Sequence, residues 1–173
     1  MNKIIFTGPM GAGKTTAIAT VSDVPPIFTE VKATDDEVKQ RKETTTVSMD
    51  YGYIVLDDQT KVHLYGTPGQ KRFSYMWPIL TEGGLGLVLL LDNAAENPIN
   101  DMFYYLDAFA DFIEKTTVVI GVIRCDVSQK VHIQDYQNSL MEKELVYPIF
   151  EVDSREANDI KTLLHALLAM LQY

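Results

Sequence analysis

Residues 8–15 read Gly-Pro-Met-Gly-Ala-Gly-Lys-Thr, and they fit the pattern G-x-x-x-x-G-K-[ST]. The apolar run Ile4-Ile5-Phe6 precedes them, and the helix-compatible residues 16–19 follow. A strand, this loop and a helix in that order are typical of a phosphate-binding loop. Backbone N–H groups of the loop and the positive end of the helix dipole form a site for a polyphosphate. The stretch therefore predicts an α/β protein that binds a nucleoside phosphate, the alternative being a flexible glycine turn.

Two side chains of this loop have predicted roles toward the ligand. Lys14 carries a positive charge that can reach the β and γ phosphates, and the hydroxyl of Thr15 can ligate Mg²⁺. The remaining candidate nucleotide contacts of the loop are Gly8, Met10, Gly11, Ala12, Gly13 and Thr16.

The composition suits one nucleotide-binding domain that spans residues 1–173. Hydrophobic residues make up 46% of the chain and charged residues 23%, as in ordinary globular proteins. The net charge is −9, and the sequence has no block of Lys and Arg that could neutralise a nucleic-acid backbone or an anionic membrane. We therefore expect protein partners, and no binding to nucleic acid.

Several sequence features bear on location. Cys125 is the single cysteine, which excludes an internal disulfide and a cysteine-rich metal site. Residues 1–3 lead directly into a strand, which leaves no room for a signal peptide, and no apolar stretch reaches membrane-spanning length. The sequence has no prenylation motif and no Gly at position 2 for myristoylation. We expect a soluble cytoplasmic protein without an intrinsic membrane anchor.

Strands and helices alternate along the chain, which predicts a three-layer fold with a mostly parallel sheet covered on both faces. The expected strands are 3–7, 47–56, 61–65, 85–91, 117–123 and 147–152. The expected helices are 14–21, 70–81, 99–113, 131–143 and 156–171. The turn at 57–60 predicts an antiparallel edge hairpin between strands 47–56 and 61–65. Residues 27–31 could form an additional edge strand.

Two further loops are candidates for sensing the γ-phosphate. The polar connection 22–46 is unusually long for a compact domain, and it ends in three threonines, of which Thr46 is the preferred carrier of a hydroxyl to the phosphate and metal. Residues 66–70 follow strand 61–65 at the sheet edge where ligands of open α/β sheets bind. There, Gly69 offers an N–H to the γ-phosphate and Gln70 an amide that could orient a water molecule. A plain turn is the alternative for this second loop.

A third candidate loop follows the apolar strand 117–123. The carboxylate of Asp126 can accept hydrogen bonds from N1–H and N2–H of guanine, a pair of donors that adenine does not offer. Arg124 can lie along the base. Read alone, Asp126 could equally be the N-cap of the next helix.

Together these residues resemble the Ras-like small GTPases, most closely the bacterial branch that includes the MglA-type polarity switches and the conservon GTPases. The resemblance spans essentially the whole chain and implies the P-loop NTPase fold of small GTPases. It identifies the phosphate loop with residues 8–15, the switch I threonine with Thr46 or a neighbour, and the D-x-x-G-Q pattern of switch II with Gly66 to Gln70.

The base-reading motifs of that family fall on two other loops. The N-K-x-D motif corresponds to residues 123–126, and the S-A-K-type loop lies near residues 153–155. The resemblance thus adds Ser154 and Arg155 to Arg124, Asp126 and Gly69 as candidate nucleotide contacts.

The chain departs from the family pattern at three places. Gly66 stands where D-x-x-G has its Asp, so the metal must depend more on Thr15 and Thr46, with Asp50 or Asp92 as candidate replacements. Ile123 and Arg124 stand where N-K-x-D has Asn and Lys, which removes one polar group that braces the base. The third departure is an insertion that lengthens switch I.

The resemblance implies a molecular switch that binds GTP and Mg²⁺ and hydrolyses GTP slowly to GDP, with Gln70, Lys14 and Thr46 as catalytic residues. It also implies regulation of a bacterial signalling, motility or polarity pathway, through a GTPase-activating protein of the roadblock type and an effector protein bound at switches I and II. The alternatives are a nucleotide-binding scaffold or pseudo-GTPase that does not cycle, an ATP-binding P-loop protein, and a small-molecule kinase.

Two predictions concern the partners. An arginine that assists hydrolysis within this chain could come only from Arg41, Arg72 or Arg124, so we expect slow turnover that a partner accelerates. The large side chains that follow Gln70 are candidates for a partner-binding surface, with packing onto the core as the alternative. They are Phe73, Tyr75, Met76 and Trp77.

Overall fold

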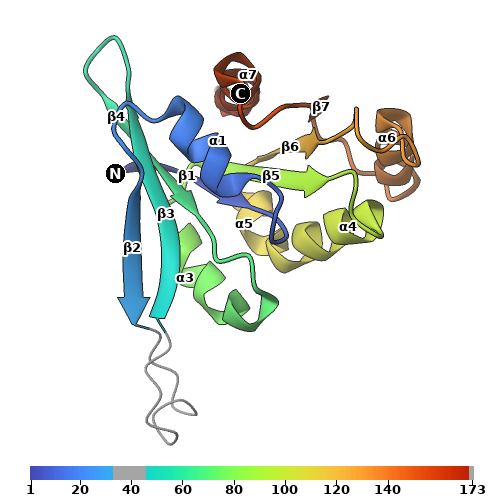
Figure 1. Ribbon diagram of the computed structural model, residues 1–173, viewed down its shortest axis with the longest axis horizontal. Coiled ribbons are helices and arrows are strands. Elements are labelled where there is room, and N and C mark those ends of the chain that lie inside the picture. Colours follow the sequence, from blue (N-terminus) through green and yellow to red (C-terminus); the bar gives the residue numbers. More distant parts are fainter. Residues whose placement is uncertain (33–45, 172–173) are drawn as a thin grey trace, which may run out of the picture.

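The computed structural model describes residues 1–32 and 46–171, and seven strands in these ranges form one sheet (Figure 1). The strand order is β2-β3-β4-β1-β5-β6-β7. The strands are β1 (Asn2–Thr7), β2 (Ile27–Lys32), β3 (Thr46–Val55), β4 (Lys61–Gly66), β5 (Gly86–Asp92), β6 (Val118–Ile123) and β7 (Ile149–Glu151). Strands β4, β1, β5, β6 and β7 are mutually parallel, which confirms the predicted mostly parallel sheet.

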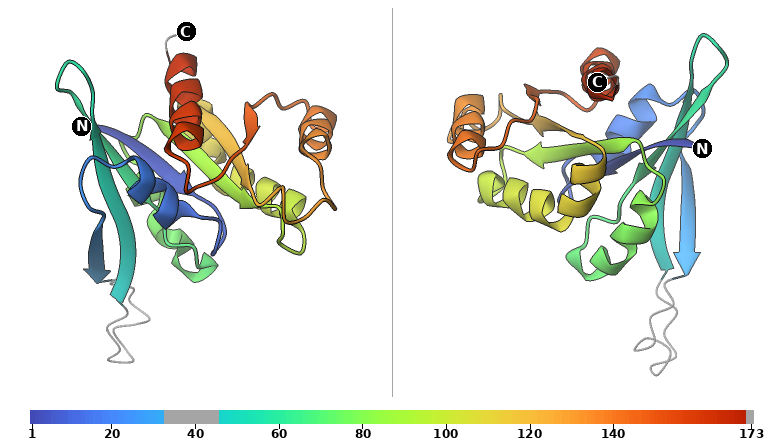
Figure 2. Two further views of the ribbon diagram at one scale, coloured as in Figure 1. Left: turned by 45° about the horizontal axis from the view of Figure 1, so that its top comes forward. Right: turned by 180° about the vertical axis from the view of Figure 1, so that it is seen from behind.

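Helices cover both faces of the sheet (Figures 1 and 2). The helical elements are α1 (Lys14–Val21), the 3₁₀-helix η1 (Lys71–Met76), α3 (Trp77–Thr81), α4 (Pro98–Ala108), α5 (Ala110–Lys115), α6 (Ile133–Glu142) and α7 (Ala157–Met170). Buried residues of α1 and α7 form one hydrophobic core with the sheet, and buried residues of α4, α5 and α6 form the other. The three layers are those of the predicted P-loop NTPase fold.

The central strands are apolar on both sides because each side faces a core. In β5, Val88 and Leu90 belong to the core beneath α1 and α7, whereas Leu87, Leu89 and Leu91 belong to the opposite core. All five side chains are fully buried. Alternation with a period of two therefore disappears from the sequence, as is typical of parallel strands buried on both faces.

The antiparallel edge consists of two strand pairs. Strands β3 and β4 form the predicted hairpin, with Asp50 opposite Gly66 and Tyr51 opposite Tyr65. Strand β2 pairs antiparallel with β3, so the additional edge strand expected at 27–31 is present at Ile27–Lys32.

Two predicted helices differ from the observed ones. The helix expected at 70–81 is a 3₁₀ segment followed by α3, and Pro78 lies in the first turn of α3, where its missing N–H costs no hydrogen bond. The helix expected at 99–113 is interrupted at Phe109, whose backbone is not helical (φ −104°, ψ 15°) and whose ring stacks on Trp77 at 5.0 Å. The sequence around Phe109 has no Gly or Pro that would indicate this break.

None of the helices in the described ranges has the length and apolar composition that crossing a membrane requires.

Candidate nucleotide-binding site

The phosphate loop joins the C-terminal end of β1 to the first residue of α1. Gly13, which precedes α1, has a φ of 84°, and a Cβ there would collide with the hydroxyl of Ser154. Gly8 has a φ of 145°, and a Cβ there would collide with the carbonyl oxygen of Leu90. Only glycine meets both the backbone conformation and the close approach at these two positions.

Lys14 is buried at the centre of this loop. Its side chain is only 7% exposed, and its Nζ donates hydrogen bonds to the carbonyl oxygens of Gly8 (2.6 Å) and Pro9 (2.8 Å). Burial lowers the pKa of Lys14 to about 8, and the negative charge of Asp50 opposes that shift. The ammonium group is thus held by the loop itself, at the place where the motif predicts contact with phosphates.

Thr15 is exposed at the start of α1, and its hydroxyl donates a hydrogen bond to Oδ2 of Asp50 over 2.7 Å. Hydroxyl and carboxylate oxygens are the ligand types that Mg²⁺ prefers. Within the described ranges no three His, Cys, Asp or Glu side chains gather as a metal site of their own. A Mg²⁺ ion here would therefore take most of its ligands from phosphate and water, as is usual beside bound nucleotides.

The loop after β4 folds onto the phosphate loop. Thr67 donates its N–H to the carbonyl oxygen of Phe6 (2.9 Å), and its hydroxyl lies 2.8 Å from that of Thr7. A Cβ placed on Gly69 would lie 3.1 Å from Nζ of Lys14. The predicted γ-phosphate sensor is therefore beside the predicted phosphate-binding lysine.

The other residues predicted to act on the γ-phosphate are less fully described. Gln70 is half-buried and precedes η1, whose Phe73 donates its N–H to the Gln70 carbonyl oxygen (3.0 Å). Thr46 begins β3, but its side chain lies outside the described part of the chain. Thr44, Thr45 and Arg41 lie outside the described residues altogether.

A cavity of about 530 Å³ adjoins the phosphate loop at the C-terminal ends of β6 and β7. Its lining includes the predicted contacts Gly13, Thr16, Arg124, Asp126, Ser154 and Arg155. Asp126 is exposed in this cavity. The structure thus brings together, around one hollow, residues that the sequence assigned to three separate motifs.

Ser154 indicates that the hollow is suited to a polar ligand. Its side chain is only 6% exposed, yet its Oγ has no hydrogen-bond partner among the described residues. An unpaired buried hydroxyl is costly. The hydroxyl of Thr20 on α1 donates to the Ser154 carbonyl oxygen (2.8 Å), which fixes the position of this loop. A ligand with a donor or acceptor at this point would satisfy the free hydroxyl.

The two arginines of the hollow are tied to acidic neighbours. Nη2 of Arg124 donates to the Gly11 carbonyl oxygen (3.0 Å) and lies 2.7 Å from Oδ2 of Asp92. The guanidinium of Arg124 thus contacts the phosphate loop, and only its stem is available to lie along a base. Arg155 makes two hydrogen bonds to the carboxylate of Asp153 (2.9 and 2.8 Å), which lowers the pKa of Asp153 to about 2.

Sequence reasoning missed Asn93, which directly follows β5. This buried side chain donates to the carbonyl oxygens of Ser128 (2.7 Å) and Val131 (2.9 Å), and it accepts from the hydroxyl of Tyr136 (2.6 Å). These bonds hold the segment after β6 that carries Asp126. The signal available in the sequence was the position of Asn93, a polar residue just after the apolar strand expected at 85–91. The loop after the other long apolar strand, 117–123, was already predicted to be functional.

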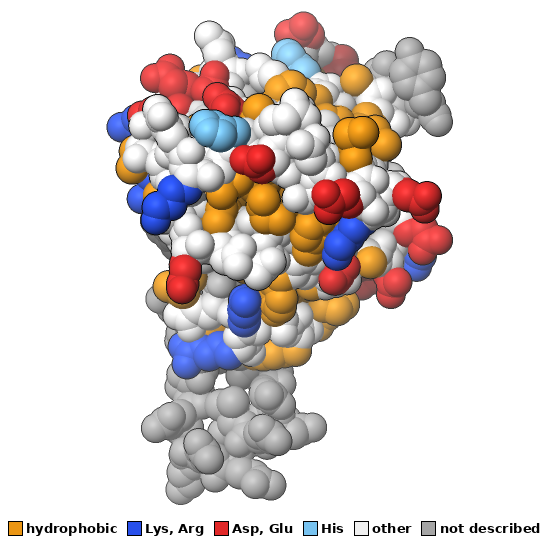
Figure 3. Space-filling model, turned by 90° about the vertical axis from the view of Figure 1, so that its right-hand side faces the viewer, with side chains coloured by type: hydrophobic (Ala, Val, Ile, Leu, Met, Phe, Trp, Pro, Cys, Tyr) orange, Lys and Arg blue, Asp and Glu red, His pale blue; other side chains and the backbone are white. Residues whose placement is uncertain are grey.

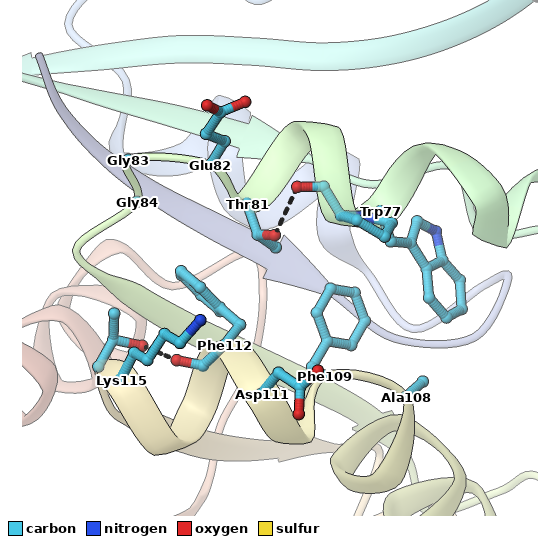
Figure 4. A pocket seen from close by; sticks show the side chains of 12 residues that line it. Trp77, Thr81, Glu82, Gly83, Gly84, Ala108, Phe109, Asp111, Phe112 and Lys115 are labelled. Carbon is cyan, nitrogen blue, oxygen red and sulfur yellow. Dashed lines mark hydrogen bonds between the residues drawn. The ribbon is translucent and has the colours of Figure 1, made fainter.

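A second cavity, of about 490 Å³, lies between α3 and α5 (Figure 4). Trp77, Phe109 and Phe112 give it an apolar lining, and the hydroxyl of Thr81 already donates to the Pro78 carbonyl oxygen (3.0 Å). Residues of the phosphate loop are not part of its lining. The first hollow is the candidate site because it adjoins the phosphate loop at Gly13 and is lined by the predicted contacts Asp126 and Ser154.

The surface is consistent with the acidic composition. On the face shown in Figure 3, acidic side chains are spread between small groups of lysine and arginine.

Comparison with known proteins adds a family to this geometry. The family described as a conserved hypothetical ATP-binding protein matches residues 23–172. The chain belongs to this family. The match begins beyond the phosphate loop at 8–15, so the family and the loop support nucleotide binding from different parts of the sequence. The protein is therefore a member of a nucleotide-binding P-loop family.

One curated relative is an uncharacterized protein of the archaeon Methanocaldococcus jannaschii. It is 32% identical over 90 residues, which cover 52% of this chain and 50% of the relative. The chain thus spans about half the length of the curated relative it matches. Neither comparison names the Ras-like small GTPases, so that resemblance stays a prediction.

Proposed function

We propose that residues 1–173 form one G domain that binds a guanine nucleotide with Mg²⁺, hydrolyses GTP slowly and acts as a cytoplasmic molecular switch. The observation that carries the proposal is the hollow of about 530 Å³ beside the phosphate loop, lined by the exposed carboxylate of Asp126 and by the hydroxyl of Ser154, which has no hydrogen-bond partner in the described part of the chain. A nucleotide with its phosphates on residues 8–15 would have room for its base in this hollow.

The base would be selected by hydrogen bonding. Guanine presents N1–H and N2–H to one carboxylate, and Asp126 has two oxygens to accept them. Adenine offers no matching pair, so it would leave the carboxylate poorly matched. Asn93 supports this role because it holds the segment that carries Asp126.

The phosphate side would perform hydrolysis mainly by positioning and charge, as is general for phosphoryl transfer. The ammonium of Lys14 would exchange the Gly8 and Pro9 carbonyl oxygens for phosphate oxygens, and the N–H of Gly69 would bond the γ-phosphate. Gln70 would orient the attacking water. Thr15 and Thr46 would hold Mg²⁺. The ion would supply positive charge that neutralises the negative charge developing on the phosphate oxygens.

A protein partner completes the proposal. Arg124 is engaged by Gly11 and Asp92, and the guanidinium of Arg72 lies 4.7 Å from the centre of the Phe73 ring. Both guanidinium groups are therefore engaged in contacts other than one to the γ-phosphate. We propose that a GTPase-activating protein, of the roadblock type implied by the resemblance, accelerates turnover, and that an effector binds at switches I and II of this member of the Ras-like bacterial branch.

A second candidate is an ATP-binding P-loop protein, which the description of the family favours. A scaffold that holds nucleotide without cycling is the related alternative, because Gly66 and Ile123 depart from the GTPase motifs.

The first test is base preference. We expect GTP and GDP to bind at least about tenfold more tightly than ATP and ADP, because an unmatched bonding pair costs about 1–3 kcal/mol. Asp126→Ala should reduce that preference in calorimetry, whereas Asp107→Ala, which removes an exposed carboxylate from α4, should not. Chromatography of the nucleotide in the protein as purified gives an independent answer. Equal affinities for GDP and ADP would end the guanine proposal and favour the ATP-binding candidate.

The second test separates a switch from a scaffold. In single-turnover reactions we expect slow hydrolysis of GTP by the isolated protein, and a further reduction of roughly 10²-fold in Gln70→Leu because the water loses its orientation. GDP affinity should be unchanged in that variant. Gln134→Leu, which alters an exposed glutamine on α6, is the matched control. GTP that stays intact on the wild-type protein would support the scaffold.

A further inference from the structure

Gly66 ends β4 directly opposite Asp50 of β3. Paired residues of antiparallel strands project to the same face of the sheet, so Asp50 lies beside the position that a side chain at residue 66 would occupy. A Cβ built on Gly66 would lie 3.1 Å from both Cβ and Oδ2 of Asp50, and 3.3 Å from Cδ1 of Ile18 on α1. Asp50 and Ile18 therefore leave little room for a side chain at residue 66.

The contact between Asp50 and Thr15 points to a ligand. Thr15 donates its hydroxyl proton to Oδ2 of Asp50. A hydroxyl has one proton and two lone pairs, so this bond leaves the lone pairs of Thr15 free to face a cation. Among the described residues, none donates a hydrogen bond to the second carboxylate oxygen of Asp50, which could accept one from metal-bound water.

The other acidic candidate, Asp92, is already engaged. Its Oδ2 lies 2.7 Å from Arg124, and its Oδ1 accepts the N–H of Ala94 (2.9 Å). Asp92 therefore neutralises Arg124, whose guanidinium contacts the phosphate loop at Gly11. Asp50 is the acidic side chain that is bonded to Thr15.

We propose that Asp50 supplies, from β3, the carboxylate that holds Mg²⁺ at the bound nucleotide, and that residue 66 is glycine because Asp50 takes its place. This inference rests on the proposed function, since the metal would be carried in with the phosphates. The resembled family has its Asp at the position of Gly66. In this chain the acidic group would stand on the paired strand β3 instead, and metal binding would be retained.

The test uses Mn²⁺ as a paramagnetic substitute for Mg²⁺, because both ions favour carboxylate and water ligands. Mn²⁺ binding to the full chain loaded with GDP, or with ADP if that binds better, is measured by electron paramagnetic resonance. We expect Asp50→Asn to weaken Mn²⁺ binding by about 10–100-fold, the usual effect of losing a group that supports metal ligands. Asp57→Asn, in the exposed hairpin turn beyond the other end of β3, is the matched control and should bind Mn²⁺ as the wild type does.

A second readout separates a metal role from a structural one. In EDTA, the carboxylate of Asp50 repels the phosphates, so Asp50→Asn should bind the metal-free nucleotide as tightly as the wild type or more tightly. A merely structural role for Asp50 would instead weaken nucleotide binding with and without metal, and that result would overturn the inference.

The exchange variant gives the sharpest test. Asp50→Gly combined with Gly66→Asp moves the carboxylate to the opposite strand, and it should recover most of the Mn²⁺ affinity. Gly66→Asp alone should lower the melting temperature, because two carboxylates would share one space. If Asp50→Asn does not fold, the exchange variant decides, and loss of Mn²⁺ binding in it would overturn the inference.

The two levels of proposal fail differently. A wild-type protein that binds neither guanine nor adenine nucleotides would refute the proposed function and the metal assignment together. Unaltered Mn²⁺ affinity in nucleotide-loaded Asp50→Asn would refute the metal assignment alone.

Discussion

Lys14 shows how one buried charge can prepare a binding site. Its ammonium group donates hydrogen bonds to the carbonyl oxygens of Gly8 and Pro9. Carbonyl groups carry only partial negative charge, so the ammonium is less stable there than in water, and burial lowers its pKa to about 8. Phosphates carry full negative charge and would reverse that effect. The loop thus holds the ammonium group in place, and bound phosphates would supply the full negative charge that the carbonyl groups lack.

We expect nucleotide binding to take up protons at pH 8 to 9. The pKa of Lys14 is about 8 in the free protein, and bound phosphates raise it, so molecules with a neutral lysine must acquire a proton. Near pH 8 the uptake should be roughly half a proton per nucleotide, and it should grow toward pH 9. Calorimetry in buffers of different ionisation enthalpy measures this quantity.

Lys3 provides the control for this measurement. Burial lowers its pKa too, but its ammonium lies 5.8 Å from the centre of the Tyr65 ring, away from the phosphate loop. Lys3→Met should therefore keep the proton uptake. Proton release on binding, or uptake that does not change between pH 7.5 and 9, would contradict the assignment to Lys14.

At the scale of elements, the segment that follows Gln70 packs differently from the prediction. Phe73, Met76 and Trp77 are 8%, 8% and 3% exposed, so core packing is the correct interpretation for three of the four candidate anchors. The spacing of three between Phe73 and Met76 matches one turn of the 3₁₀-helix η1, which turns both toward Met49 of β3. Tyr75 is 43% exposed and remains a candidate for partner contact, and Ile79, which was not among the predicted candidates, is 70% exposed.

Two substitutions in this segment should therefore differ strongly in their effect on stability. Phe73→Ala should lower the free energy of unfolding by about 3 kcal/mol, because it empties a small hydrophobic cluster. Tyr75→Ala should change it by no more than about 0.5 kcal/mol, as is usual for exposed positions. Urea titration followed by circular dichroism measures both values. Similar losses in the two variants would mean that Tyr75 also belongs to the core.

Elements with a continuous or periodic apolar pattern could be predicted from the sequence, and those shaped by tertiary contact could not. Strands β5 and β6 and helix α7 lie within a residue or two of their predicted bounds. The break at Phe109 depends on a ring of another element, Trp77, and no local signal records that contact.

At the scale of the whole molecule, the same distinction applies to the candidate site. The phosphate loop could be predicted because its function requires particular residues in a short consecutive stretch. The bond between Thr15 and Asp50 joins positions 35 residues apart, and it depends on the register of β3 against β4. A shift of one residue would turn Asp50 to the other face of the sheet. The sequence therefore indicates Asp50 and Asp92 as possible replacements for the Asp that is missing at position 66, but it contains nothing that favours Asp50 over Asp92.

The central place of β1 in the sheet has a consequence for biosynthesis. Asn2 pairs with Val62, and Ile4 pairs with Gly86. A ribosome adds about 5–20 residues per second, so the apolar strand with Ile4 and Phe6 waits roughly 3–12 s for β4, and longer for β5. The hairpin of β3 and β4 can close meanwhile, because its contacts are local. Although the phosphate loop is translated almost first, its neighbours on both sides of β1 are complete only after β4 and β5 have been added.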